Sequence, residues 1–389
     1  METVASTLDP QELIGLTFAE FSAYLARKIG FHPRFHRSLY RQLMVTGVCD
    51  PAQEPMWHEA ERGSPGALAR VTAAVTSASG SATSALPEVV AEHSTHAVGV
   101  GTTRKLVCRL ADGREVESVL IPMGGGHQDG GYATVCVSSQ VGCKMGCRFC
   151  HTATMGLIRN LSAAEIVAQV VVAAVVSGIR PRNVVFMGMG EPLDNLDAVA
   201  QAVRVLTDVN GLGLAQRHIT ISTVGRVDQL PRLTDLGLTR INLAVSLTAA
   251  DDVLRSEWIP LNRVYGLTQL KEELLNYPLG RGRRILVSYV LMAGVNDGDA
   301  HIADLIRWCA GLTVLVNLIP FNPIPSRPEV PTAQERIDQI QALLEVAGIE
   351  TRQRRTKGDG VMAACGQLGD PSQRKQTKRS TREQRAPQD

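Results

Sequence analysis

Three closely spaced cysteines are the residues of this sequence best suited to carry chemistry. They lie in Cys143-Lys-Met-Gly-Cys147-Arg-Phe-Cys150, with the pattern C-x3-C-x2-C. Three thiolates on one short loop can hold three irons of a [4Fe–4S] cluster, which ordinarily takes four cysteine ligands. Because no fourth cysteine lies nearby in the sequence, one iron would stay open to chelation by the amino and carboxylate groups of S-adenosylmethionine. The spacing therefore predicts a cluster that generates a radical from this cofactor.

Two other interpretations apply to the same loop. His151 could join the three cysteines in a zinc site, although the adjacent Cys150 and His151 make an awkward tetrahedron. Alternatively, the cysteines could be buried and inert, but such residues usually occur singly rather than at this spacing. We expect the iron–sulfur cluster and keep zinc as the alternative.

The elements that must position this loop form a repeating pattern. The expected strands are Thr134–Val137, Asn183–Met189, His218–Val224, Ile241–Leu247, Ile285–Met292 and Val314–Ile319. The expected helices between and after them are Ala163–Ser177, Leu196–Thr207, Val227–Leu236, Leu267–Asn276, Asp299–Ala310 and Thr332–Ala347. Continuous apolar strands separated by helices are typical of parallel β/α units. The pattern predicts an α/β fold, a partial (β/α)6 barrel with its site at the C-terminal ends of the strands.

The sequence on either side of this barrel divides into further segments. We expect a small helical accessory domain over 1–99, in which Thr17 and Glu20 form a capping box. Residues 100–131 read as a β-hairpin that turns at Asp112-Gly113, followed by a glycine-rich connection over 124–131. The barrel core would then span 132–370.

Charge and hydropathy restrict the partners and the cellular compartment that the sequence predicts. Lys and Arg number 40 against 38 Asp and Glu, so net charge alone favours no partner. The last segment, 371–389, is a basic tail expected to be disordered, and a helix with Arg34, Arg37 and Arg41 is either a solvated face or an RNA-contacting one. No apolar stretch approaches the ~20 residues of a membrane span, and no export signal is visible. We expect a cytoplasmic protein whose cysteines serve a metal or catalysis rather than a disulfide framework.

Several motifs together carry a resemblance to a known family. They are CVSSQVGCKMGCRFCHTATMGLIRNL (136–161), NVVFMGMGEPLDN (183–195), HITISTVGRV (218–227), VNLIPFNPIP (316–325) and RRTKGDGVMAACGQL (354–368), with GTTRKLVCRLADGREVESVLIP (101–122) in the hairpin. In these segments the chain resembles the radical S-adenosylmethionine superfamily and, within it, the RlmN/Cfr family of RNA adenine methyltransferases. The resemblance covers roughly 100–370 closely and 1–99 only loosely.

The resemblance assigns cofactor contacts residue by residue. It implies that S-adenosylmethionine is bound by Gly190, Glu191, Ser222, Ser246, Leu247, Thr248 and Asn322. The family usually has histidine where this chain has Thr248, which can still form a hydrogen bond but cannot stack or carry charge.

The resemblance also assigns roles to three residues that the pattern alone would place in the core, for the two cysteines, or on an exposed strand face, for the glutamate. In the family, the position of Cys365 is methylated, and that of Cys136 later pairs with it in a transient disulfide. Glu117 matches the family's proton acceptor, although Glu115 lies on the same strand face by its period of two. A thiol pair suits the chemistry, because the ring carbons C2 and C8 of adenine are electron-poor and cannot attack a methylsulfonium directly.

The implied activity is radical methylation of an adenine ring carbon, with C2 in large-subunit rRNA expected first and tRNA as a further substrate. The implied partners are RNA and an electron donor such as flavodoxin or ferredoxin, and we expect a monomer. Two alternatives remain: a C8-specific or otherwise retargeted relative, and a non-catalytic iron–sulfur RNA-binding protein. A passive binder has no need of the Cys136 and Cys365 pair.

Overall fold

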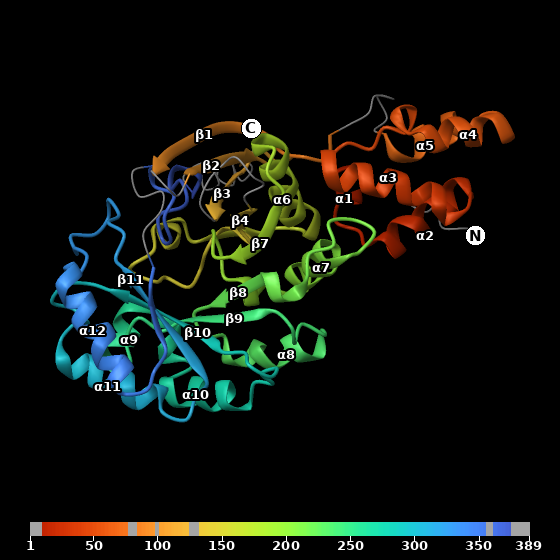
Figure 1. The fold of residues 1–389 in the computed structure, drawn as a ribbon. Coiled ribbons are helices and arrows are strands. Elements are labelled where there is room, and N and C mark those ends of the chain that lie inside the picture. Colours follow the sequence, from red (N-terminus) through yellow and green to blue (C-terminus); the bar gives the residue numbers. More distant parts are fainter. Residues whose placement is uncertain (1–9, 77–83, 98–100, 124–131, 355–360, 375–389) are drawn as a thin grey trace, which may run out of the picture.

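The computed structural model describes residues 10–76, 84–97, 101–123, 132–354 and 361–374. Its largest element is a ten-stranded sheet in the order β1-β2-β3-β4-β7-β8-β9-β10-β11-β12 (Figure 1). The strands up to β4 pair antiparallel, and every pairing from β4 to β12 is parallel. The antiparallel strands β1 to β3 therefore belong to the same continuous sheet as the parallel strands of the barrel.

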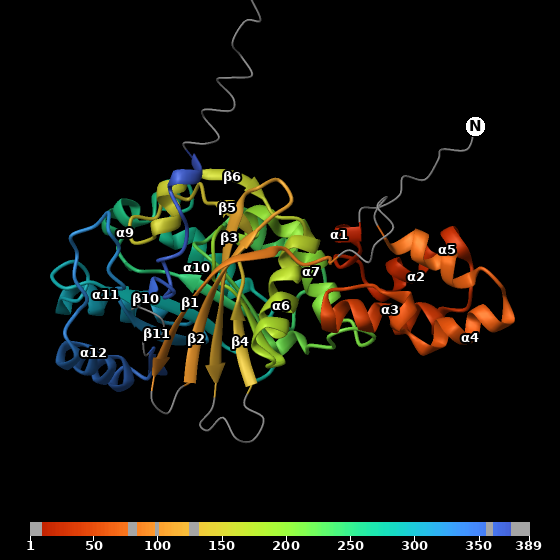
Figure 2. The same cartoon turned by 90° about the horizontal axis from the view of Figure 1, so that it is seen from above.

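The barrel elements confirm the predicted α/β order. The strands are β4 (Tyr132–Cys136), β7 (Pro181–Phe186), β8 (Ile219–Thr223), β9 (Asn242–Ser246), β10 (Ile285–Leu291) and β11 (Val314–Pro320). The helices between and after them are α6 (Ala163–Ser177), α7 (Leu196–Thr207), α8 (Leu230–Asp235), α10 (Leu267–Asn276), α11 (Asp299–Cys309) and α12 (Gln334–Val346). Figure 1 shows these helices around the outside of the strands, which leaves the inner side of the sheet for the site, and Figure 2 shows β2, β3 and β4 side by side.

Four elements of the sheet region were not expected from the sequence. The strand β12 (Thr351–Gln353) pairs parallel with β11, the helix α9 (Asp252–Trp258) follows β9, and β5 (Gln140–Gly142) pairs with β6 (Leu157–Asn160) on either side of the cysteine loop. These elements are short, and β5 and β6 are only three and four residues long. Runs of this length carry too little periodicity to be recognised.

The expected hairpin is present as β2 (Gly101–Arg109) and β3 (Glu115–Met123), with its turn at Asp112-Gly113. A third strand, β1 (Glu88–Ala97), pairs with β2, so the range 1–99 holds a strand of the sheet as well as helices. The glycine-rich connection over 124–131 lies outside the described residues.

The helices near the N-terminus form a separate layer beside α6 and α7 (Figure 1). They are α1 (Pro10–Leu13), α2 (Phe18–Ile29), α3 (Pro33–Thr46), α4 (Pro55–Gly63) and α5 (Ala67–Val75). The predicted capping box of Thr17 and Glu20 starts α2. The layer is joined to the barrel by the Phe18 N–H, which donates to Asp208 Oδ2 at 2.6 Å, and by Gly15, which lies against Ala164.

Other features of the sequence fall at the ends of the described chain. Of the expected basic tail, 371–374 is described and 375–389 lies outside the described residues. Within the described residues, no helix has both the length and the apolar character that crossing a membrane requires.

Candidate functional site

Two cavities that share part of their walls lie on the inner side of the sheet. The first, about 140 Å³, is lined by the cysteine loop and by residues at the C-terminal ends of β7 to β11. The second, about 420 Å³, is lined by Thr134 in the middle of β4 and by Thr220 and Leu286 near the N-terminal ends of β8 and β10. Because strands on opposite sides line one space, the sheet must curve around it, as a partial barrel does.

All three cysteines of the loop line the first cavity. Cys143 and Cys147 are buried and Cys150 is half-buried. The loop leaves β5 at Gly142, where φ is 75° and a Cβ would lie 1.9 Å from the Gly156 carbonyl oxygen, so only glycine fits there. The Cys143 N–H then donates to that carbonyl at 2.9 Å. A tight turn therefore directs three sulfurs to one wall.

The chemistry of these thiols suits a metal cluster. Burial raises the pKa of Cys143 to about 12 and that of Cys147 well above its ordinary value, and the neighbouring thiols raise both further. Three thiolates here would repel one another in a medium of low polarity, and bound iron supplies the positive charge that stabilises them. Among the described residues, no group of three His, Cys, Asp or Glu side chains is arranged closely enough in this conformation to hold a metal ion. The donor set nevertheless matches the three-cysteine cluster. His151, the fourth ligand of the zinc alternative, is not among the residues lining this cavity.

Five of the seven residues expected to contact S-adenosylmethionine line the same cavity. They are Gly190, Glu191, Ser222, Ser246 and Asn322. The Glu191 carboxylate is buried and accepts from the Leu193 N–H at 3.1 Å and the Val224 N–H at 2.9 Å. Burial raises the pKa of Glu191, while these donors lower it. A carboxylate held in this way next to the cysteine loop can receive an ammonium group.

The other two expected contacts, Leu247 and Thr248, do not line the cavity. Leu247 is fully buried and its N–H donates to the Ser288 carbonyl at 2.9 Å. Thr248 has a φ of 61°, which a β-branched residue rarely adopts, and its buried hydroxyl has no partner among the described residues. Its carbonyl accepts from Asn296 Nδ2 at 2.7 Å. This strained turn lies at the position for which the resemblance implies histidine in the family.

Cys365 occupies the junction between the two cavities. It lines both, whereas Cys136 at the end of β4 lines only the second and the loop cysteines line only the first. Arg354 also lines both cavities. Burial, with a smaller contribution from Cys365, raises the pKa of Cys136 to about 12, while Arg354 acts to lower it. Cys365, in turn, raises the pKa of Arg354. The fold thus brings both expected cysteines together around one cation.

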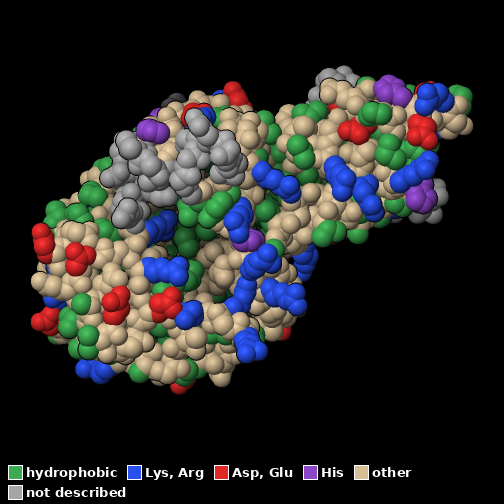
Figure 3. All heavy atoms as spheres, in the orientation of Figure 1, with side chains coloured by type: hydrophobic (Ala, Val, Ile, Leu, Met, Phe, Trp, Pro, Cys, Tyr) green, Lys and Arg blue, Asp and Glu red, His purple; other side chains and the backbone are tan. Residues whose placement is uncertain are grey.

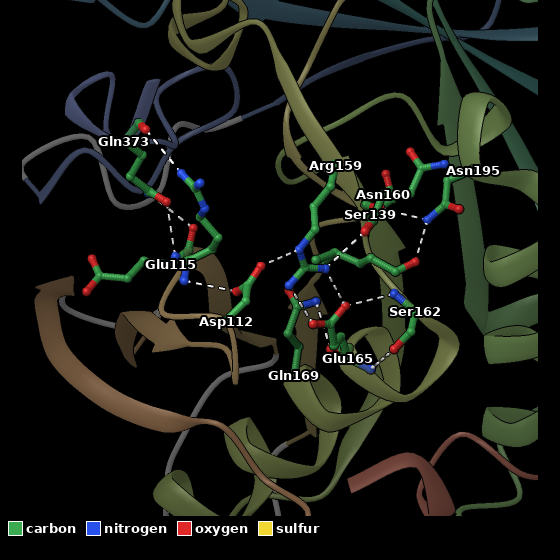
Figure 4. A network of polar contacts seen from close by, with 12 residues as sticks. Asp112, Glu115, Ser139, Arg159, Asn160, Ser162, Glu165, Gln169, Asn195 and Gln373 are labelled. Atoms are coloured by element: carbon green, nitrogen blue, oxygen red, sulfur yellow. Dashed lines mark hydrogen bonds and ion pairs between the residues drawn. The ribbon is translucent and has the colours of Figure 1, made fainter. Parts of the chain in front are cut away.

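The segment that carries Cys365 is held on several sides. Asn322 Nδ2 donates to the Cys365 carbonyl at 2.9 Å, and Thr152 Oγ1 donates to the Leu368 carbonyl at 2.6 Å. Further along, the Glu115 N–H donates to Gln373 Oε1 at 3.0 Å (Figure 4). Figure 4 also shows the neighbouring contacts: the backbone N–H of Arg114 donates to Asp112, and Arg159 contacts both Asp112 and Glu165 at the start of α6. The loop is therefore fixed both to the cofactor side and to the hairpin.

Glu117 lies on the inner face of β3 but outside the two main cavities. It lines a separate cavity with Met189 and Gly369, and its Oε2 accepts from the Gly369 N–H at 3.1 Å. Its Oε1 lies 3.5 Å from Lys105 Nζ, and both residues are buried. Glu115, the other residue that the period of two allows, instead pairs with Arg109 at 3.0 Å. Glu117 therefore contacts the segment of Cys365, four residues downstream of that cysteine.

Two contributors were missed or only partly recognised from the sequence. Lys105 could have been found from the hairpin register, because it pairs with Val119 and so shares a face with Glu117. Arg354 lies in a basic run of the sequence with Arg352, Arg355 and Lys357, and nothing in the run itself distinguishes it. Arg352 lines only the second cavity and lies 3.5 Å from Glu350, while Arg355 and Lys357 fall outside the described residues. Only the fold selects Arg354 from this run.

A cysteine loop after the first barrel strand, facing a cavity at the strands' C-terminal ends, defines a class of enzyme. The family profile described as "Radical SAM superfamily" matches residues 137–306. A crystal structure of a radical SAM methyltransferase from Sphaerobacter thermophilus is 38% identical, with a TM-score of 0.75 over 92% of this chain and 98% of that one. The class is a radical S-adenosylmethionine enzyme, which implies a [4Fe–4S] cluster and this cofactor.

Curated relatives narrow the class. The dual-specificity RNA methyltransferase RlmN of Syntrophobacter fumaroxidans is 46% identical over 68% of this chain and 76% of its own length. The protein of that name from Methylorubrum extorquens is 45% identical over 72% and 69%, and a probable RlmN 1 of Protochlamydia amoebophila is 42% identical over 69% and 74%. The chain belongs to the RlmN family of radical SAM RNA methyltransferases.

Proposed function

We propose that this chain methylates an adenine ring carbon of RNA through a methyl group carried by Cys365, with C2 of an adenine in large-subunit rRNA as its first substrate. One observation carries the proposal. Cys365 lies between the cavity of the three loop cysteines and the cavity of Cys136. A sulfur at this junction can meet the cofactor on one side and the base and a second thiol on the other.

The first cavity is proposed to hold the cofactors. Cys143, Cys147 and Cys150 would ligate the cluster, and the residues that line the cavity beside them would contact S-adenosylmethionine, with Leu247 and Thr248 supporting them from behind. When bound, the cluster and S-adenosylmethionine supply a deoxyadenosyl radical, which removes a hydrogen atom from a methyl group. A one-electron donor such as flavodoxin or ferredoxin would reduce the system, and the chain would act as a monomer in the cytoplasm.

The remaining steps are proposed to use this chain's own side chains. The Cys365 sulfur accepts a methyl group from one S-adenosylmethionine, because a thiolate attacks a sulfonium where adenine C2 or C8 cannot. The methylene radical left on Cys365 would bond to the adenine ring carbon, Glu117 would accept the ring proton, and the one electron left over would return to the oxidised cluster. Cys136 would then attack the sulfur of Cys365, so that the S–S bond forms, the S–C bond breaks, and the carbon on the base takes up a proton to become a methyl group.

The test is methylation by the anaerobically reconstituted protein. Incubated with S-adenosylmethionine, a reductant and rRNA or tRNA, it should yield methyladenosine that mass spectrometry identifies, with 2-methyladenosine and 8-methyladenosine separated by chromatography. Cys143→Ala should lose both cofactor cleavage and methylation, because one cluster ligand is gone. Zinc-loaded, iron-free protein that methylated RNA would contradict the proposal, as would iron-loaded protein that cleaved the cofactor and left every adenine unmodified.

A further inference from the structure

A basic groove lies at the end of the barrel opposite the cysteine loop. It has a volume of about 700 Å³ and is lined by Arg180, Arg182, Arg217 and His218, with no acidic residue among its lining residues. Pro181 opens β7 and Tyr132 opens β4, and both also line it, so it runs along the N-terminal ends of the barrel strands. Figure 3, which shows this end of the molecule, displays Lys and Arg side chains gathered beside a hollow.

The cations of this groove are available to a ligand. Arg180, Arg182 and Arg217 are exposed, and within the described parts of the chain no carboxylate pairs with any of them. Arg182 lies over the Tyr132 ring, 4.7 Å from its centroid, which orients the guanidinium without neutralising it. The pKa of His218 is lowered, first by burial and then by the charges of Arg217 and Arg182. The positive charges therefore converge on one place, as in a phosphate-binding surface.

The groove continues into the cavity that holds the two reactive cysteines. Met123 lines both the groove and the second cavity. The same transition occurs along β4, where Tyr132 lines the groove and Thr134 the cavity, and at the start of β8, where His218, the residue before the strand, lines the groove and Thr220 the cavity. Residues two apart on a strand share a face, so these pairs mark one wall that runs inward from the groove. The first cavity, in contrast, opens among the C-terminal ends of the strands.

We propose that the RNA substrate enters from the N-terminal end of the barrel strands, so that its phosphates lie in the groove of Arg180, Arg182 and Arg217 while the target adenine passes Met123 into the cavity of Cys136 and Cys365. The proposal rests on the proposed function. It requires the adenine to be unstacked and turned out of its strand, which a single-stranded loop or bulge permits at low energetic cost. It also separates the two ligands, because base and cofactor reach Cys365 from opposite ends.

The helix α3 carries the arginines for which the sequence left open a solvated or an RNA-contacting face, and it supplies a matched control. Arg34 lies 3.8 Å from Glu59, and Arg37 is held over the Phe18 ring. A double substitution on α3 removes the same charge as one in the groove.

The experiment compares Arg182→Gln/Arg217→Gln with Arg34→Gln/Arg41→Gln. Binding of a labelled RNA transcript that the unaltered protein methylates is measured across a salt series. The groove variant should bind at least tenfold more weakly, and the slope of log affinity against log salt should fall by about 2, one for each lost phosphate contact. Its iron content and its cleavage of S-adenosylmethionine without RNA should not change. The α3 variant should bind as the unaltered protein does.

A second variant tests the route rather than the charge. Met123→Trp places a large side chain where groove and cavity meet, so RNA should still bind while methylation falls at least tenfold. Groove and α3 variants with equal affinity, a loss of binding confined to the α3 variant, or full methylation by Met123→Trp would each overturn the proposed route. All of these comparisons use an RNA on which the unaltered protein is active. Failure of the unaltered protein to methylate any RNA would instead overturn the proposed function.

Discussion

Arg354 places a fixed positive charge beside Cys136 and Cys365, the two cysteines that the proposed function uses in turn. Burial raises the pKa of Cys136 to about 12, and the charge of Arg354 works in the opposite direction. At neutral pH, Cys136 is therefore a thiol, and its attack on a thioether needs the small thiolate fraction that the cation favours. Arg354 should for this reason matter most in the release of the methylated base.

Removal of this charge gives a pH-dependent prediction. Arg354→Met should raise the pKa of Cys136 further, so less thiolate forms at a given pH and release of the methylated base slows in proportion. The protein–RNA adduct should accumulate at pH 7 and decline as pH rises toward 9, because the thiolate fraction grows about tenfold with each pH unit below the pKa. Gel analysis of denatured samples across this range measures the ratio of adduct to methyladenosine.

Arg354→Lys is the matched control, because it keeps the positive charge. It should lie closer to the unaltered protein at every pH. Equal adduct levels in the Met and Lys variants would show that the charge has no part in release.

The buried pair Lys105 and Glu117 links strands β2 and β3 to the segment that carries Cys365. Lys105 and Glu117 side chains are only 9% and 12% exposed, and Glu117 also accepts from the Gly369 N–H. Loss of one partner leaves the other charge buried and unpaired, which is more costly than loss of both. We therefore expect the contributions of Lys105 and Glu117 to the free energy of unfolding to be coupled.

A double-mutant cycle measures this coupling. Lys105→Met should lower the free energy of unfolding by about 3 kcal/mol, because the Glu117 carboxylate stays behind without its cation. Lys105→Met/Glu117→Gln should recover most of that loss, since the amide can still accept from Gly369. Denaturant unfolding of the four proteins gives the coupling energy. Losses that simply add would contradict a buried, interacting pair.

Local pattern was enough to predict most elements of the barrel, but not the finer parts of its site. Helices α6, α7 and α10 begin and end at the residues expected from the sequence. The pattern could not show that Leu247 and Thr248 turn away from the cavity, because that depends on a positive φ at Thr248. Nor could it select Arg354 from its basic run, or place Lys105 beside Glu117, since both depend on contacts between distant segments. The roles given to Cys136, Cys365 and Glu117 came from the resemblance, and they stay predictions.

The two cavities place the cysteines of the proposed site in sequence along the inner side of the sheet. The loop cysteines line the first, Cys136 lines the second, and Cys365 lies between them, held by Asn322 and by the hairpin contacts of Gln373. A cysteine that only filled space in the core would not need to face the loop cysteines in one cavity and Cys136 in the other. The arrangement suits a sulfur that collects a methyl group from one side and delivers it on the other.

The measurement that tests this most directly compares Cys136→Ala with Cys365→Ala. Cys365→Ala should still cleave S-adenosylmethionine but give neither methylated protein nor methylated RNA. Cys136→Ala should accept the methyl group, join to the adenine and stop there, because no thiol remains to attack the sulfur of Cys365. The account predicts RNA that stays attached to the denatured Cys136→Ala protein and a modified peptide containing Cys365 in its digest. Robust methylation of RNA by Cys136→Ala, with no attached RNA, would contradict it.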